Sequence, residues 1–229
     1  MNPITVLLAD DHLILREGLR ALLKKESDIE VVAEAGDGRQ SLELTRKLRP
    51  DVVVMDIAMP LLNGIEATRQ ILHELPETKV LILSAYSDDS YVQQVMALGA
   101  RGYLIKQSTA HMLAEAIRRV QQGQTCFSKF ISSRLHYHEV KARTDGKLQT
   151  KTSATHLSSR EMEVLQLIVE GNANKEIAEV LSISIKTVEK HRQNLMDKLN
   201  IHETAGLTRY AIATGVIESS VQATTATPS

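Results

Sequence analysis

DVVVMD, residues 51–56, is the stretch that decides the fold of the first half of the chain. A short β-branched run that starts after a proline and ends at an acid is typical of a strand buried in a parallel sheet. Similar runs, each followed by a longer segment with helical periodicity, recur from Ile4 to about Gln121. This alternation predicts a parallel sheet with helices on both faces.

The sheet is expected to have five strands, at residues 4–9, 29–35, 51–55, 79–84 and 102–105. The helical stretches between them include residues 13–24 and 40–48. The second of these ends before Pro50, because a proline disfavours helix in the residue that precedes it. We therefore predict an α/β doubly wound five-stranded parallel sheet of the flavodoxin-like type.

The length of 229 residues suits two domains of ordinary size. The apolar periodicity fades after the sheet and returns, in helical form only, near Leu157. We predict a sheet domain over residues 1–122, a flexible linker over 123–156, an all-α four-helix domain over 157–217 and a disordered tail over 218–229.

Composition excludes several classes of protein. The 27 basic and 28 acidic residues nearly balance, so net charge alone does not predict a nucleic-acid partner. Cys126 is the single cysteine, which excludes an intrachain disulfide and is consistent with a reducing cytosol. No apolar run approaches the roughly 20 residues that span a bilayer. We expect a soluble, cytoplasmic protein without a membrane partner.

Polar residues stand at the ends of four expected strands. Asp10 and Asp11 follow the first strand and Asp56 the third, Ser84 ends the fourth, and Lys106 follows the fifth. In doubly wound sheets the carboxyl ends of the strands form the ligand site, so we expect these side chains to meet there. Clustered carboxylates repel one another unless a cation lies among them, and Mg²⁺ prefers such oxygen ligands.

A carboxylate in such a site can act as a nucleophile toward a phosphoryl group, while a lysine and a hydroxyl bind the transferred oxygens. The simpler interpretation of any one aspartate is a helix cap or a turn former. The joint pattern at several strand ends favours phosphoryl chemistry over that interpretation.

These segments resemble the signature segments of two-component receiver domains: Asp10-Asp11, DIAMP at 56–60 with Asn63-Gly64, Ser84-Ala85, and GARGYLIK at 99–106. The resemblance implies that a sensor histidine kinase phosphorylates Asp56. It also implies that Asp11, Asp56 and the Ala58 carbonyl bind Mg²⁺, with Asp10 acting through water. By the same resemblance Lys106 pairs with the phosphoryl group, and Ser84 with Tyr103 forms a conformational switch.

The second domain starts with Ser158 and Glu161, which are spaced as a capping box at the beginning of a helix. Gly171 is expected to end that helix. A second helix from about Asn174 to Leu181 and a third helix capped by Ser184 follow after a short turn. Two short helices joined in this way predict a helix-turn-helix.

The third helix has two different faces on an ideal helical wheel. Ile185, Leu195 and Leu199 fall on one face, which is expected to point inward. The opposite face carries polar side chains that can contact base edges or phosphates, although a merely solvated face remains an alternative. They are Lys186, Thr187, Glu189, Lys190, Gln193 and Asn194.

Residues 157–217 resemble the LuxR/NarL-type DNA-binding domain, through LSSRE at 157–161, Gly171, NKEIA at 174–178, Thr187-Val188, His191 and Lys198-Leu199. The resemblance implies that the polar side chains of the third helix face DNA and that Lys175 lies near phosphates. Ala173 stands where the family often has a capping serine, so Asn172 or Asn174 is expected to cap the second helix.

The leading hypothesis is a phosphorylation-dependent transcription regulator that binds double-stranded promoter DNA. A homodimer is expected on phosphorylation or on DNA, because one small domain buries little surface. RNA polymerase is a further candidate partner. A phosphatase with an aspartate nucleophile would need a second aspartate where Ala58 stands, so we expect no turnover enzyme. An interaction module whose C-terminal helices bind protein remains an alternative.

Overall fold

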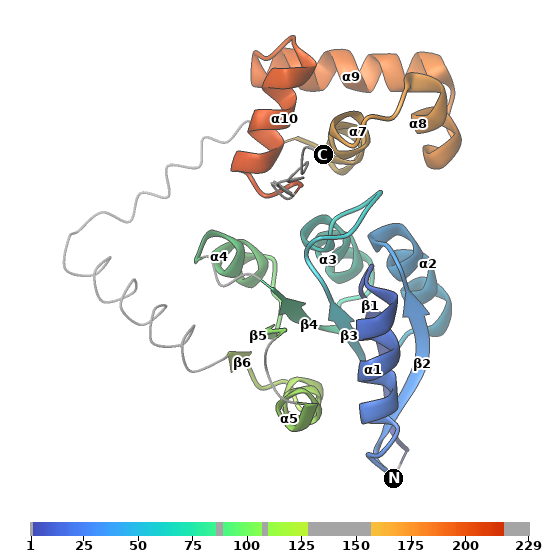
Figure 1. Ribbon diagram of the computed structural model, residues 1–229, viewed down its shortest axis with the longest axis vertical. Coiled ribbons are helices and arrows are strands. Elements are labelled where there is room, and N and C mark those ends of the chain that lie inside the picture. Colours follow the sequence, from blue (N-terminus) through green and yellow to red (C-terminus); the bar gives the residue numbers. More distant parts are fainter. Residues whose placement is uncertain (1, 86–88, 107–109, 128–156, 218–229) are drawn as a thin grey trace, which may run out of the picture. The chain divides into compact units, whose positions relative to one another are not determined.

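The computed structural model describes residues 2–85, 89–106, 110–127 and 157–217 (Figure 1). The chain divides into two compact units, Met1–Glu163 and Val164–Ser229. Most of the predicted linker, residues 128–156, and the predicted tail, residues 218–229, lie outside the described residues. Among the residues described, no helix is both long and apolar enough to cross a membrane.

The first unit contains a parallel sheet with the strand order β2-β1-β3-β4-β5-β6. Its strands are β1 (Ile4–Ala9), β2 (Ile29–Ala35), β3 (Val52–Met55), β4 (Lys79–Ser84), β5 (Gly102–Ile105) and β6 (Cys126–Phe127). The five predicted strands are confirmed, with β3 starting one residue later than expected. The sixth strand was not predicted, because two residues are too few to show an alternating pattern.

In the part of the first unit that the structure describes, helices cover both faces of the sheet (Figure 1). They are α1 (Leu13–Leu23), α2 (Gly38–Leu48), α3 (Gly64–Glu74), α4 (Asp89–Ala97) and α5 (Ala110–Gln121). Helix α2 begins two residues earlier than predicted, because the Asp37 side chain accepts a hydrogen bond from the Gln40 amide at 2.8 Å and caps the first turn. It ends at Leu48, followed by Arg49 in the left-handed conformation before Pro50.

The apolar side chains of the sheet form two cores, one on each face. Along β3, Val53 and Met55 pack in the core that includes residues of α2, α3 and α4, whereas Val52 and Val54 pack in the core that includes residues of α1 and α5. Successive side chains of a strand point to opposite faces. A strand that is covered on both faces therefore needs an uninterrupted apolar sequence, as residues 52–55 have.

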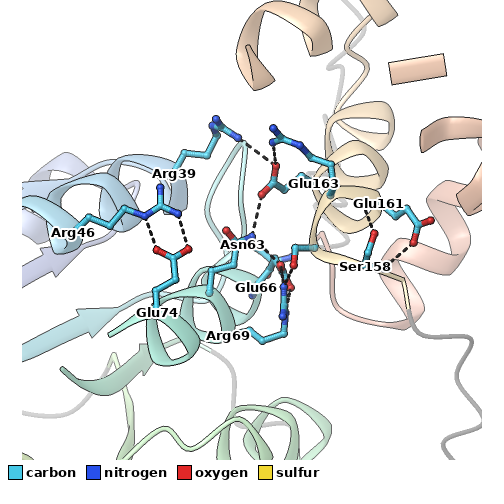
Figure 2. A network of polar contacts seen from close by, with 12 residues as sticks. Arg39, Arg46, Asn63, Glu66, Arg69, Glu74, Ser158, Glu161 and Glu163 are labelled. Atoms are coloured by element: carbon cyan, nitrogen blue, oxygen red, sulfur yellow. Dashed lines mark hydrogen bonds and ion pairs between the residues drawn. The ribbon is translucent and has the colours of Figure 1, made fainter. Parts of the chain in front are cut away.

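The loop between β3 and α3 is held tightly by Asn63 and Gly64. The Asn63 side chain accepts a hydrogen bond from the Glu66 amide at 2.9 Å and caps α3, and Glu66 forms an ion pair with Arg69 (Figure 2). The Gly64 amide donates to the Ile57 carbonyl at 2.8 Å. A Cβ at position 64 would lie 1.8 Å from the Asp56 carbonyl oxygen, so only glycine allows this close approach.

Four helices follow in the C-terminal part: α7 (Ser159–Val169), α8 (Asn174–Leu181), α9 (Ile185–Leu199) and α10 (Thr204–Ala213). The predicted capping box is present, because the Ser158 amide donates to the Glu161 carboxylate at 2.7 Å and the Glu161 amide donates to the Ser158 hydroxyl at 3.3 Å (Figure 2). Gly171 follows α7 with a φ of +92°. Ser184 caps α9 by accepting from the Thr187 amide at 3.1 Å.

The predicted cap of α8 is wrong, because neither neighbouring asparagine occupies that position. Ala173 is the capping residue, and its amide donates to the Glu176 carboxylate at 2.6 Å. Asn172 instead donates to the Leu167 carbonyl at 3.0 Å, and Asn174 accepts from Arg192 of α9 at 3.2 Å. The Asn172 side chain thus binds a carbonyl near the end of α7, and the Asn174 side chain joins α8 to α9.

Candidate functional site

The order of the strands places the candidate site between β1 and β3. Strand β1 lies between β2 and β3, so the connection from β1 to β2 runs in one direction along the sheet and the connection from β3 to β4 runs in the other. A crevice forms at the carboxyl ends of the strands at such a reversal of order. Asp10 directly follows β1 and Asp56 directly follows β3, and both are almost completely buried. The Asp56 amide donates to the Ala9 carbonyl at 2.8 Å, which holds the two strand ends together.

Lys106 bridges these two acids. Its Nζ lies 2.8 Å from Asp10 Oδ2 and 2.7 Å from Asp56 Oδ2. Lys106 reaches this position because its own amide donates to the Ser84 carbonyl at 2.8 Å, which extends the pairing between β4 and β5. The structure therefore brings together three charged side chains that follow three different strands.

Burial changes the protonation behaviour of this cluster. Removal from water raises the pKa of Asp56 to about 6, although the hydrogen bond from Lys106 acts in the opposite direction. Burial by itself would lower the pKa of Lys106, but the hydrogen bonds to Asp10 and Asp56 outweigh it and raise that pKa. A charged lysine therefore faces a carboxylate whose negative charge is poorly solvated, which is a suitable arrangement for a nucleophile.

Asp11 and His12 complete the cluster on its solvent side. One ligand atom from each of Asp10, Asp11, His12 and Asp56 lies within 4.8 Å of the others. His12 Nδ1 is 2.7 Å from Asp11 Oδ1 and 3.2 Å from Asp10 Oδ1. The three carboxylates are hard oxygen donors that fit Mg²⁺. The sequence analysis did not include His12, although its place directly after the acidic pair was a signal for it.

The remaining residues expected at this site are Ser84, Tyr103 and Ala58. Ser84, the last residue of β4, and Tyr103 of β5 are both completely buried. Tyr103 belongs to the core that includes Val92 and Val95 of α4. Ala58 lies, half-buried, in the loop that follows Asp56.

Helix α9 presents a polar face. Lys186, Glu189, Lys190, Gln193 and Asn194 are all exposed, and Lys175 is exposed in the first turn of α8. The faces opposite these residues are buried.

Thr187 is half-buried, and its hydroxyl lies 2.8 Å from that of the capping residue Ser184. Gln193 Nε2 donates to Asp197 Oδ1 at 2.7 Å. These two expected DNA-facing side chains are thus already engaged within α9 or at its start.

The inward orientation predicted for Ile185 is wrong. Leu195 is buried and Leu199 half-buried, but the Ile185 side chain is 46% exposed. Ile185 is the first residue of α9 and lies about 60° around an ideal helix from the buried Val188. At that angle and in the first turn, it lies at the edge of the buried stripe, next to the polar face.

The sheet region and the C-terminal helical region each match a known protein family. Residues 6–118 match the response regulator receiver domain. Residues 155–211 match the family described as bacterial regulatory proteins, luxR family.

Whole proteins and solved structures are similar to the chain over most of its length. It is 39% identical to the transcriptional regulatory protein DegU of Brevibacillus brevis, over 88% of this chain and 90% of that protein. It is 40% identical to the transcriptional regulatory protein LiaR of Bacillus subtilis, over 91% of this chain and 96% of that protein. A structure of the RcsB response regulator of Salmonella typhimurium is 28% identical and covers 93% of this chain and 100% of its own, with a TM-score of 0.55. With a receiver domain, a LuxR-type helix-turn-helix domain and relatives that span both, the chain belongs to the DNA-binding response regulators of two-component systems.

Proposed function

We propose that Asp56 accepts a phosphoryl group from a histidine kinase and that this event controls the binding of α9 to promoter DNA. The observation that carries the proposal is the bridge from Lys106 to Asp10 and Asp56, with distances of 2.8 and 2.7 Å. A receiver domain implies a kinase partner, and a structure of RcsB is described as a complex with DNA.

The reaction follows from the groups that surround Asp56. A carboxylate oxygen of Asp56 attacks the phosphorus of a phosphohistidine, an O–P bond forms, and the N–P bond to the histidine breaks. The carboxylate must be ionised to attack, which a pKa near 6 allows at neutral pH. Lys106 is placed to neutralise the charge that arrives on the phosphoryl oxygens.

Magnesium fits this pocket as the cation that completes it. We propose that Asp11, Asp56 and the Ala58 carbonyl hold Mg²⁺, with Asp10 acting through water. When bound, Mg²⁺ neutralises charge on the phosphoryl oxygens. The support is the set of carboxylate oxygens within 4.8 Å of one another. Ala58 has no group that could act as an acid or base, which is why we propose acceptance of a phosphoryl group without turnover of a substrate.

The signal is proposed to leave the site through Ser84 and Tyr103. The Ser84 hydroxyl can donate to a phosphoryl oxygen on Asp56, and a movement of Ser84 changes the space available to the aromatic ring of Tyr103. Both side chains are completely buried, so a change at one of them has to be accommodated by its neighbours.

The exposed face of α9 supports the proposal for DNA. Its candidates for contacts are Lys186, Thr187, Glu189, Lys190, Gln193 and Asn194, with Lys175 of α8 near phosphates. We propose that two copies bind one site, because a symmetric pair gains affinity across two half-sites. Contact with RNA polymerase is a further proposal. The predicted end of the sheet domain at residue 122 is too early, because β6 extends the sheet to Phe127. Residues 1–127 and 157–217 are proposed as the units that carry the two activities.

The proposal for Asp56 is tested by Mg²⁺-dependent labelling of the full chain with a radioactive small phosphodonor such as acetyl phosphate. The wild type is expected to form an acid-stable, base-labile acyl phosphate, and Asp56→Ala is expected to form none. Asp51→Ala serves as the control, because Asp51 lies at the amino end of β3, whereas Asp56 lies at its carboxyl end. Undiminished labelling of Asp56→Ala would show that Asp56 is not the acceptor.

The proposal for DNA is tested with Lys190→Ala in the full chain. Loss of one phosphate contact is expected to weaken operator binding and to reduce the salt dependence of the affinity by about one unit of slope. Lys24→Ala, which removes an exposed lysine from the region after α1, is the matched control. An unchanged affinity and salt slope would remove Lys190 from the interface.

A further inference from the structure

The exposed face of α9 carries two acids with different surroundings. The Asp197 carboxylate is engaged, because its Oδ1 accepts the hydrogen bond from Gln193 Nε2 at 2.7 Å. Glu189 is also exposed, but none of the residues that the structure describes forms a hydrogen bond or an ion pair with its side chain. Its two carboxylate oxygens are therefore available to an external donor.

The position of Glu189 indicates which group of a bound DNA could donate a hydrogen bond to its carboxylate. It lies in the second turn of α9, next to Lys190 and three residues after Lys186, and these two lysines are exposed as well. The N-terminal half of a recognition helix is the part that enters the major groove. Lysines beside the groove can bind phosphates, whereas a carboxylate that faced a phosphate would be repelled.

The apolar neighbour of Glu189 supports a base contact over a phosphate contact. Ile185, which precedes Glu189 by one helical turn, is 46% exposed. An apolar side chain gains nothing from a phosphate but can contact the methyl group of thymine in the major groove. This side of α9 thus presents groups that suit base edges.

We propose that Glu189 determines sequence specificity by accepting a hydrogen bond from the N4 amino group of a cytosine. This inference rests on the proposed function, in which α9 enters the major groove. An ionised carboxylate only accepts hydrogen bonds, and the amino groups of cytosine and adenine are the donors in that groove. Adenine also presents its N7 acceptor beside the amino group, and guanine and thymine present acceptors, all of which repel a carboxylate.

The proposal predicts a specific change of preference rather than a loss of binding. Sites are selected from random DNA duplexes with the full-length wild type and with Glu189→Ala, Glu189→Gln and Asp197→Asn. We expect one position of the wild-type site to prefer cytosine, by about fivefold to tenfold. Glu189→Ala should lose that preference, and Glu189→Gln should shift it toward adenine, whose N6 and N7 suit an amide.

Asp197→Asn is the matched control, because it removes the same charge from the same helix face. We expect it to keep the cytosine preference at the position assigned to Glu189. Circular dichroism and binding to non-specific DNA check that every variant folds and binds.

Two outcomes would overturn the inference, and they can be told apart. If the wild type selects a defined site and the Glu189 variants select the same site with the same cytosine preference, the role of Glu189 is refuted while the proposed function stands. If the wild type, with or without a phosphodonor, selects no site and binds no DNA, the proposed function fails and the inference fails with it.

Discussion

Replacing Asp56 by asparagine should stabilise the metal-free protein at neutral pH. Burial raises the pKa of Asp56 from its ordinary value of 3.8 to about 6 in the folded state. A carboxyl group with a higher pKa in the folded than in the unfolded protein lowers the free energy of unfolding as it ionises. Asparagine has nearly the same shape and no charge to desolvate, so it removes this cost.

The magnitude follows from the difference in pKa. Each pH unit corresponds to about 1.4 kcal/mol, so the variant should gain about 3 kcal/mol in free energy of unfolding above pH 7. The wild type loses this stability as the pH rises from about 4 to about 6, because the folded state binds the proton more tightly in that window. Roughly half of the gain should remain at pH 5, and almost none should remain below pH 4.

The assay is urea denaturation followed by far-ultraviolet circular dichroism, with a chelator present, at several pH values between 5 and 8. Circular dichroism is suitable because the chain has no tryptophan. A separate denaturation of the wild type with Mg²⁺ in place of the chelator identifies which unfolding transition belongs to the sheet domain, because Mg²⁺ should shift that transition. Asp11→Asn is the control, because it removes an equal charge from the same cluster at a position that is more exposed.

The reasoning would be refuted if Asp56→Asn and the wild type had equal free energies of unfolding at pH 7.5. It would also be refuted if a gain were present but did not shrink between pH 7.5 and pH 5. A pH-independent gain would arise from packing rather than from the buried charge. A gain of the same size in Asp11→Asn would show that burial of Asp56 is not its cause.

Three further predictions concern the metal, the loop and the recognition helix. If Mg²⁺ binds the folded acidic pocket as proposed, millimolar Mg²⁺ should raise the thermal midpoint of the wild type and should raise that of Asp56→Asn much less. Equal shifts in a calorimetric scan would contradict the proposed site. Gly64→Ala should lower the free energy of unfolding by more than about 2 kcal/mol in urea denaturation, because its Cβ would lie 1.8 Å from the Asp56 carbonyl oxygen. Ser184→Ala should lower the free energy of unfolding of the helical unit by about 1 kcal/mol, because α9 loses its cap, and Ser184→Gly should recover most of this loss. Urea denaturation of the full chain measures both changes.

The elements that could be predicted from the sequence are those specified by local patterns. The strand at residues 52–55 was predicted to within one residue, because a strand covered on both faces has a continuous apolar sequence. The capping box at Ser158 and Glu161 was predicted because its two hydrogen bonds join residues only three apart.

The predictions that failed depended on neighbours distant in the chain. Whether Asn174 caps α8 or binds Arg192 is decided by how α8 and α9 pack. Helical periodicity predicted the direction in which the Ile185 side chain points. Its exposure depends on which other residues pack over that side of the helix, and the periodicity does not contain that information. Strand β6 exists because the edge of β5 offers unpaired backbone groups to it.

By itself the sequence determined which chemical groups stand at the ends of the strands and on the exposed side of α9, because periodicity and turn residues act over short distances. The order of strands expected from the sequence also predicted that Lys106 and Asp56 would lie at the same end of the sheet, although they are 50 residues apart. Only the tertiary structure decided that Lys106 Nζ lies 2.7 Å from Asp56 Oδ2 and that Asp56 is buried enough for its pKa to rise to about 6. The physical reason is that distance and desolvation are properties of packed strands, which no local pattern of residues contains.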